Sequence, residues 1–213
     1  MLYETSKVLD IELEKVKLEG DLNIPKGASG IVVFAHGSGS SRKSPRNNFV
    51  AETLQQQNIG TLLFDLLTQR EDQLRANRFD IPLLTNRLSE VTSWLMERED
   101  YDDQKIGYFG SSTGAASALK AAVERKEQVS AVVSRGGRVD MASDVVADVE
   151  AATLLIVGGR DTQVLEWNKD IYSKLNSEKK LVVIEGAGHL FSGPGELEDV
   201  AKKAADWFEY YLK

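Results

Sequence analysis

The sequence predicts an α/β fold with a mostly parallel central sheet, an antiparallel edge at its N-terminal side and helices on both faces. Three observations support this prediction. Apolar runs typical of buried strands alternate with amphipathic, helix-favouring runs. Two alternating apolar–polar segments come before the first buried strand. Small or charged residues follow most of the apolar runs, as they do where a strand ends in a loop.

The N-terminal segment predicts the antiparallel edge. Residues 7–24 alternate between apolar and charged side chains, and Gly20-Asp21 interrupts them. This pattern indicates two antiparallel strands with one buried face, joined by a turn at the interruption. Pro25-Lys26-Gly27 ends the unit.

The remaining elements alternate along the chain. The continuous apolar character of 30–35 is typical of a central strand that is buried on both faces. Asp80 and Pro82 indicate the start of a helix, and residues 65–80 before it form a polar, charged connection. The other predicted strands are 61–64, 105–109, 129–134, 153–157 and 181–184, and the helices are 47–57, 82–95, 115–124, 165–175 and 197–211.

Composition bounds the class of protein. A chain of 213 residues fits one domain, 1–213, with a sizeable core. A net charge of −7 argues against a nucleic-acid partner, which requires a basic face. No apolar run approaches the length of a membrane span, and residues 1–5 lack the pattern of a leader peptide. The absence of cysteine excludes disulfides and thiolate sites and favours a cytoplasmic location.

The stretch Gly110-Ser111-Ser112-Thr113-Gly114 carries the main chemical signal. It follows a predicted strand and precedes a predicted helix, which is the context of a G-x-S-x-G nucleophile elbow. The two glycines allow strand and helix to approach closely, and Ser112 is expected in a strained conformation with its hydroxyl exposed. Because so short a motif also occurs by chance, it needs a base and an acid downstream.

Asp161 is the candidate acid and His189 is the candidate base. Each follows a predicted strand, so the topology brings both to the rim that holds Ser112. A serine hydroxyl needs a base to take its proton, and the base needs an acid to orient it. The order nucleophile, acid, histidine is typical of α/β-hydrolases. A base that must be neutral also predicts that acylation falls at acid pH with a single group, His189.

Each of these residues also has a structural interpretation. Asp161 is suited to capping the helix that follows it, and His189 to an ordinary loop position. Asp170 and Glu166 are alternative acids, although they lie within the helix. His36 is the alternative base, but it precedes the nucleophile in the chain and is interpreted as shaping the loop below the site.

Acyl transfer also requires donors for the oxyanion. The predicted donors are the backbone N–H groups of Thr113, at the helix N-terminus, and of Ser38, in the loop 36–41. Gly37 is the alternative to Ser38. The same loop could instead bind phosphate, but it lacks the spacing of the known glycine-rich phosphate loops.

Four segments together resemble a known family. They are Phe34–Ser41, Tyr108–Gly114, Val157–Asp161 and Gly186–Phe191, and they look like small, cap-less serine hydrolases of the dienelactone-hydrolase-like group, with the α/β-hydrolase fold. Related domains also occur fused to phosphoribosyltransferases. Dienelactone hydrolases proper use a cysteine nucleophile, so Ser112 in a chain without cysteine argues against dienelactone itself as the substrate.

The resemblance implies hydrolysis of small esters, thioesters or lactones through an acyl-enzyme on Ser112, with no metal or organic cofactor. The short segment between 138 and 152 leaves no room for a lid domain, which favours an open site for a small-molecule ester. No membrane partner is expected, because no apolar run approaches the length of a membrane span. Apolar wall candidates are Phe79, Leu67, Leu190 and Phe191, each of which equally suits core packing.

A basic cluster stands out in this acidic chain. Arg135 and Arg138 follow one predicted rim strand, and Arg42, Lys43 and Arg46 follow the predicted oxyanion loop. Arginine matches carboxylate or phosphate geometry, so Arg135 is a candidate for binding an anionic substrate group. Solvated or ion-paired charges are the simpler interpretation.

Two other functions fit the same residues. One is a non-catalytic protein of this fold used for binding or regulation, and the other is an acyltransferase, peptidase or perhydrolase on the same three residues. No feature of the sequence predicts an oligomeric state.

Overall fold

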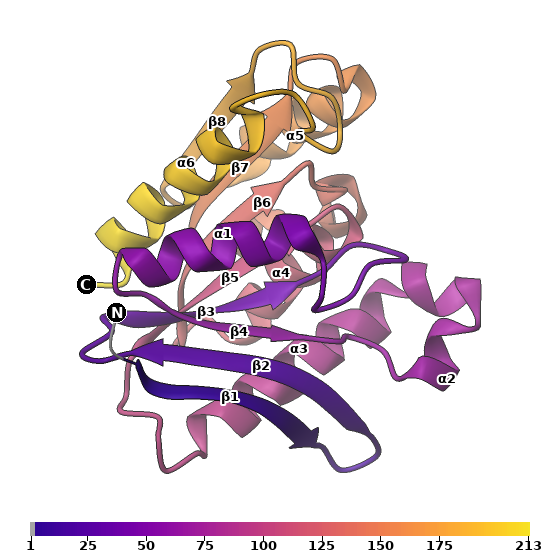
Figure 1. Ribbon diagram of the computed structural model, residues 1–213. Helices are drawn as coiled ribbons and strands as arrows, with labels where there is room; N and C mark the ends of the chain where they lie inside the picture. The colour runs from indigo at the N-terminus through magenta and orange to yellow at the C-terminus, as the bar shows by residue number, and fades with distance from the viewer. Residues whose placement is uncertain (1–2) are drawn as a thin grey trace.

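One sheet of eight strands, in the order β1-β2-β4-β3-β5-β6-β7-β8, runs through the molecule (Figure 1). The computed structural model describes residues 3–213, so Met1 and Leu2 of the segment predicted to lack a leader lie outside it. Strand β2 pairs antiparallel with β1 and β4, and every pair from β4 to β8 is parallel. The predicted architecture, with its antiparallel N-terminal edge, is confirmed.

The elements follow each other much as the sequence predicts. The strands are β1 Tyr3–Glu12, β2 Lys17–Pro25, β3 Gly30–Ala35, β4 Gly60–Phe64, β5 Lys105–Ser111, β6 Val129–Arg135, β7 Ala152–Gly158 and β8 Lys179–Ile184. The α-helices are α1 Pro45–Gln56, α2 Gln69–Asp72, α3 Ile81–Met96, α4 Thr113–Glu124, α5 Thr162–Lys174 and α6 Glu196–Tyr211, and the 3₁₀ helices are η1 Arg75–Phe79, η2 Val139–Ala142 and η3 Val146–Asp148.

The N-terminal hairpin turns at a different place from the one predicted. Its turn lies at residues 13–16, where Leu13 N–H donates to Val16 O at 2.9 Å. Gly20 lies inside β2, where it pairs with Leu9 on one side and Phe64 on the other. The glycine therefore marks an interior strand position between two neighbours, and the prediction of a turn there is wrong.

The segment 65–80 is more ordered than a plain connection. Thr68 caps α2 by accepting a hydrogen bond from Glu71 N–H, and the Glu71 carboxylate accepts from Thr68 N–H. Asp80 caps α3 by accepting from Leu83 N–H at 3.0 Å, as predicted for a helix start. The reciprocal cap satisfies backbone N–H groups at the start of α2, a helix of four residues.

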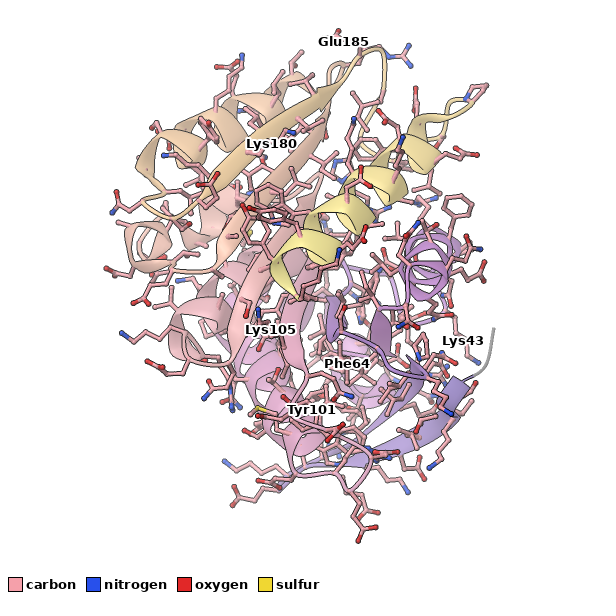
Figure 2. All side chains as sticks on the ribbon, turned by 90° about the vertical axis from the view of Figure 1, so that its left-hand side faces the viewer. Lys43, Phe64, Tyr101, Lys105, Lys180 and Glu185 are labelled. Atoms are coloured by element: carbon pink, nitrogen blue, oxygen red, sulfur yellow. The ribbon has the colours of Figure 1, made fainter. Side chains whose placement is uncertain are left out.

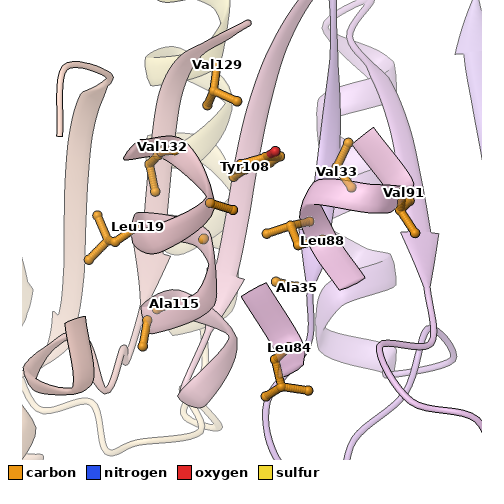
Figure 3. Packing of buried hydrophobic residues seen from close by; sticks show 14 of the residues in the cluster. Val33, Ala35, Leu84, Leu88, Val91, Tyr108, Ala115, Leu119, Val129 and Val132 are labelled. Atoms are coloured by element: carbon orange, nitrogen blue, oxygen red, sulfur yellow. The ribbon is translucent and has the colours of Figure 1, made fainter. Parts of the chain in front are cut away.

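Helices cover both faces of the sheet and enclose two hydrophobic cores (Figure 1). Helices α1 and α6 pack together over one face, with Phe34 and Phe109 beneath them. Helices α3, α4 and α5 cover the other face. In that core Tyr108 from β5 lies between side chains of α3 and α4, and its hydroxyl is 2.7 Å from Thr92 Oγ1 (Figure 3). Both cores include side chains of the central strands β3, β5 and β6, whose carboxyl ends lead to the polar residues.

Strand β8 forms the edge of the sheet opposite β1, with Lys180 on it and Glu185 just after it (Figure 2). The connection from β6 to β7 consists of short turns and the helices η2 and η3. None of the helices in residues 3–213 is long and apolar enough to cross a lipid bilayer. The single-domain prediction for 1–213 stays a prediction.

Candidate active site

The turn between β5 and α4 is a tight strand-to-helix junction. A Cβ atom at Gly110 would lie 2.4 Å from the Ala115 Cα, and one at Gly114 would lie 2.1 Å from the Ala35 carbonyl oxygen. Both distances are far below van der Waals contact, so glycine is required at each position. Gly110 brings helix and strand together, as predicted, whereas Gly114 brings the helix against the neighbouring strand β3.

Ser112 occupies this turn with a φ of 50° and a ψ of −122°. A positive φ at a residue with a side chain costs free energy and persists only where the surroundings enforce it. Here Ser112 N–H donates to Arg135 O at 3.2 Å, and Ser112 O accepts from Arg138 N–H at 2.9 Å. The end of β6 and the loop that follows it therefore hold the strained backbone of Ser112 in place.

Asp161 and His189 form a direct pair. The Nδ1 atom of His189 lies 2.6 Å from Asp161 Oδ2. With an ionised carboxylate as partner, Nδ1–H is the donor and Nε2 is left free to accept a proton. Asp161 does stand at the N-cap position of α5, but its side chain makes no capping hydrogen bond, so its carboxylate serves the histidine instead.

The alternative acids lie elsewhere. Asp170 is ion-paired with Lys174 and Glu166 with Lys169 on the exposed side of α5. His36, the alternative base, is buried, and its Nε2 accepts from Leu66 N–H at 3.0 Å. Its Nδ1 lies 3.0 Å from Gly37 O, so both ring nitrogens are engaged by the backbone. Burial lowers the pKa of His36 below its ordinary value of 6.5, which keeps the ring neutral.

Ser112 and His189 line one pocket of about 320 Å³, here called the Ser112 pocket. Its walls come from the loop after β3, the start of α1, the β5–α4 turn, the end of β6 and the loop after β8. The lining residues are Gly37, Ser38, Gly39, Ser40, Ser44, Arg46, Ser111, Ser112, Arg135, His189 and Leu190. Residues from five separate segments thus meet at the carboxyl ends of the parallel strands, as the topology predicts.

The loop after β3 lies against the nucleophile turn. Ser38 N–H donates to Thr113 Oγ1 at 2.9 Å, and a Cβ atom at Gly37 would lie 3.0 Å from the Ser112 Cβ. Thr113 is the first residue of α4, where backbone N–H groups point out of the helix end. The two predicted oxyanion donors are therefore neighbours, but Ser38 N–H already has a side-chain partner.

The five basic residues do not form one cluster. Arg42 is buried and ion-paired with Glu19, Asp21 and Asp65. Arg138 is ion-paired with Asp140 and stacks on the Trp167 ring, with 4.4 Å between its Cζ and the ring centroid. Lys43 is exposed and does not line the Ser112 pocket. Arg46 and Arg135 remain as the cations of that pocket.

The apolar wall candidates are also separated. Leu190 lines the Ser112 pocket and is 49% exposed. Phe79 lies on η1 outside that lining, with the Arg75 guanidinium 6.0 Å from its ring centroid. Leu67 and Phe191 are buried and belong to the two hydrophobic cores. Core packing accounts for Leu67 and Phe191, and a substrate contact by Phe79 stays a prediction.

Two polar contacts that support the site were not predicted from the sequence. Asn168 on α5 is fully buried, and its Nδ2 donates to Gly137 O at 2.9 Å and to Val164 O at 2.8 Å. A polar residue between Val164 and Ile171 on the apolar face of α5 was the available signal. Arg42 N–H donates to Asp65 Oδ1 at 2.8 Å and so fixes the loop after β3 to the end of β4.

The sheet order, the strained serine turn and the acid–histidine pair define the α/β-hydrolase fold. The family model of the dienelactone hydrolase family matches residues 25–212, so the chain belongs to this family. Its members are hydrolases by name, which is the class of enzyme that the fold and site indicate.

A solved structure of high sequence identity agrees with this assignment. The chain is 52% identical to a dienelactone hydrolase from Anabaena variabilis, with a TM-score of 0.96 and coverage of 98% of this chain and 99% of that chain. Est1E from Butyrivibrio proteoclasticus has a TM-score of 0.83 over 97% of this chain and 99% of its own, but at 17% identity this likeness shows the fold alone.

Two curated proteins from Mycobacterium tuberculosis strains, each named "Putative phosphoribosyl transferase", are 54% identical over 197 residues. The match covers 92% of this chain and 44% of those proteins. The chain thus spans less than half the length of the curated relatives that it matches.

Proposed function

We propose that this protein is a serine hydrolase that cleaves small carboxylic esters, and by the same chemistry thioesters or lactones. The observation that carries this proposal is the pair of Asp161 and His189, 2.6 Å apart, beside a pocket that also contains Ser112 in a strained turn. A neutral imidazole with a free Nε2 is the base that a serine hydroxyl requires. The strained backbone exposes the hydroxyl to a bound substrate.

The reaction follows from these roles. Ser112 Oγ attacks the carbonyl carbon while His189 Nε2 takes its proton, and Asp161 stabilises the resulting imidazolium. The tetrahedral intermediate collapses as His189 gives the proton to the leaving alcohol. Water then attacks the acyl-enzyme with His189 again as base, which releases the acid and restores Ser112.

The developing oxyanion requires two N–H donors. Thr113 N–H stands at the N-terminus of α4, where the helix dipole favours negative charge. Ser38 or Gly37 supplies the second donor from the loop after β3, which packs on the nucleophile turn. Each donor contributes about 10²–10³ in rate.

The hydrolase function is proposed for the segment of the longer curated relatives that this chain matches. We infer that the transferase activity in the names of the longer curated relatives resides in the 56% of their length beyond the match, since 100% less the matched 44% leaves that share. A reducing, cytoplasmic location fits a chain without cysteine.

A fluorophosphonate probe tests the activated serine directly. The native protein is expected to gain one probe per chain, and peptide mapping should place it on Ser112 rather than on the adjacent Ser111. The variant Ser112→Ala should lose both labelling and esterase activity. A native protein that fails to label would instead favour a non-catalytic binding role.

A substrate panel then separates hydrolysis from related chemistry. Short-chain esters, thioesters and lactones should be hydrolysed, with the free acid as product. Transfer of the acyl group to an added alcohol in preference to water would identify an acyltransferase. Cleavage of peptides, or formation of peracid from added peroxide, would identify the other two alternatives.

A further inference from the structure

The Ser112 pocket carries positive charge without an acidic residue in its lining. Arg46 and Arg135 are its charged members, and four serine residues besides Ser112 share the wall with them. Among the side chains described, those of residues 5–213, neither arginine has a carboxylate within ion-pair distance. Structural ion pairing therefore does not explain why two cations lie beside the nucleophile.

Arg135 is the more unusual of the two. Its Nη2 donates to Asn47 Oδ1 at 3.2 Å, while its Nη1 is buried and has no hydrogen-bond partner in the described part of the chain. A buried guanidinium normally has a carboxylate partner, as Arg42 has in Asp21 and Arg87 has in Glu71. Arg135, a residue of the pocket lining, instead has an unpaired buried donor.

The two arginines are close enough to affect each other. Burial, and to a smaller extent the positive charge of Arg46, lower the pKa of Arg135 to about 10. The guanidinium is still charged at neutral pH, so the pocket holds two positive charges that repel each other. A bound anion would offset the repulsion between the two guanidinium groups and would replace the hydration that Arg135 loses on burial.

The charge and the donors favour a dianion. Two cations balance the charge of a phosphate monoester, which approaches −2 above neutral pH. The hydroxyls of Ser40 and Ser44 offer further donors in the same wall, and Ser44 caps α1, whose N-terminus favours negative charge. Arginine binds phosphate oxygens in a bidentate manner.

The position of Arg135 indicates which part of the substrate it meets. Gly136, the next residue, packs against the imidazole: a Cβ atom there would lie 3.5 Å from His189 Nδ1. His189 protonates the leaving alcohol and lines the same pocket as Arg135, so the alcohol part of an ester shares that pocket with the guanidinium.

We propose that the preferred substrates are esters whose alcohol part carries a phosphate group, which Arg135 and Arg46 bind while Ser112 attacks the carbonyl. This inference rests on the proposed ester hydrolysis and adds the substrate class to it. No bond to phosphorus is broken: the phosphate stays on the alcohol, which leaves with the proton from His189.

Three acetate esters that differ at one position test the inference. They are the acetates of glycerol, of glycerol 3-phosphate and of glyceric acid, which end in a neutral hydroxyl, a phosphate and a carboxylate. The native protein should show a kcat/KM for the phosphate ester at least about tenfold above that for the neutral ester. Equal values would overturn the inference, and a carboxylate ester that exceeds the phosphate ester would assign the pocket to carboxylates instead.

Variants locate the effect. Arg135→Met and Arg46→Met should each lower the ratio of phosphate-ester to neutral-ester kcat/KM by about tenfold. Arg46 is only half-buried, so Arg46→Met keeps the test available if Arg135→Met does not fold. Lys43→Met removes a nearby cation outside the pocket lining and should leave the ratio unchanged. If Lys43→Met lowered this ratio as much as Arg46→Met does, the assignment of the phosphate-binding site to the Ser112 pocket would be overturned.

Calorimetry separates this inference from the hydrolase function. Inorganic phosphate titrated into Ser112→Ala should bind once per chain, about tenfold more weakly after Arg135→Met or Arg46→Met. Neutral-ester hydrolysis without phosphate binding would overturn the phosphate site and leave the hydrolase function standing. Phosphate binding in a protein that hydrolyses none of the three esters would support the anion site and overturn the hydrolase function.

Discussion

Thr113 Oγ1 accepts a hydrogen bond from Ser38 N–H at 2.9 Å and so joins the loop after β3 to the first residue of α4. The two residues are 75 positions apart in the chain, yet both were expected to supply oxyanion donors. This bond fixes the distance between the two backbone segments beneath the Ser112 pocket. It also means that Ser38 N–H must exchange or share its partner to bind an oxyanion.

The variant Thr113→Val tests this link, because valine keeps the shape of threonine but cannot accept the bond. We expect a loss of about 0.5–1.5 kcal/mol in the free energy of unfolding. We also expect a kcat/KM for ester hydrolysis lower by about three- to tenfold, since a looser loop positions its donor less well. Thr113→Ser keeps the hydroxyl and should behave as the native protein. An unchanged rate in Thr113→Val would show that the link is not needed for catalysis.

Asp161→Asn should lower kcat by about 10³–10⁴ with little change in the free energy of unfolding. The amide keeps the shape of the carboxylate but favours the wrong tautomer of His189 and does not stabilise an imidazolium. Asp170→Asn removes a carboxylate from the exposed side of α5 and serves as the matched control. Steady-state kinetics on a short-chain ester measure both variants. A larger loss of kcat in Asp170→Asn than in Asp161→Asn would reassign the acid.

His36 should make the protein less stable at acid pH. Burial lowers the pKa of His36 in the folded protein below 6.5, so the unfolded chain binds a proton first as the pH falls. The contribution of His36 to the free energy of unfolding is therefore fully present above pH 6.5. It is lost as the pH falls from there toward the lowered pKa, with a slope of at most about 1.4 kcal/mol per pH unit.

Urea unfolding of the native protein and of His36→Gln across this pH range measures that contribution. Glutamine offers an acceptor to Leu66 N–H but does not titrate, so its unfolding free energy should depend less on pH. Parallel pH profiles of the two proteins would show that His36 is not a source of the acid sensitivity.

Asn168→Leu should destabilise the protein by about 1–3 kcal/mol, because the carbonyl of Gly137 stays buried without its donor. The effect should extend to catalysis, since Arg138 N–H, one residue further, holds the Ser112 carbonyl. We therefore expect kcat to fall with KM less affected. Asn176→Ala removes an exposed asparagine that donates to Ala147 O and should change neither property. Urea unfolding and ester kinetics measure both variants.

Much of the fold could be predicted because its signals are local. Apolar runs such as 30–35 and 129–134 have the length and continuity of buried strands, and Asp80 marks the start of α3 through its own side chain. The hairpin turn was misplaced because Gly20 resembles a turn residue in sequence. Its actual position in β2 follows from strand pairing on both sides, which no local pattern reveals.

The sequence by itself determined the sheet, the serine turn and the candidate residues Ser112, Asp161 and His189, because each lies directly after a strand of recognisable pattern. The tertiary structure decided which partner each polar group has. It joined Asn168 to Gly137 across 31 positions and Arg135 to Asn47 across 88. It paired Arg138 with Asp140, whereas no carboxylate among the described side chains pairs with Arg135. Hydrogen bonds and ion pairs depend on distances of a few ångströms between remote segments, and only the packing of the whole chain sets those distances.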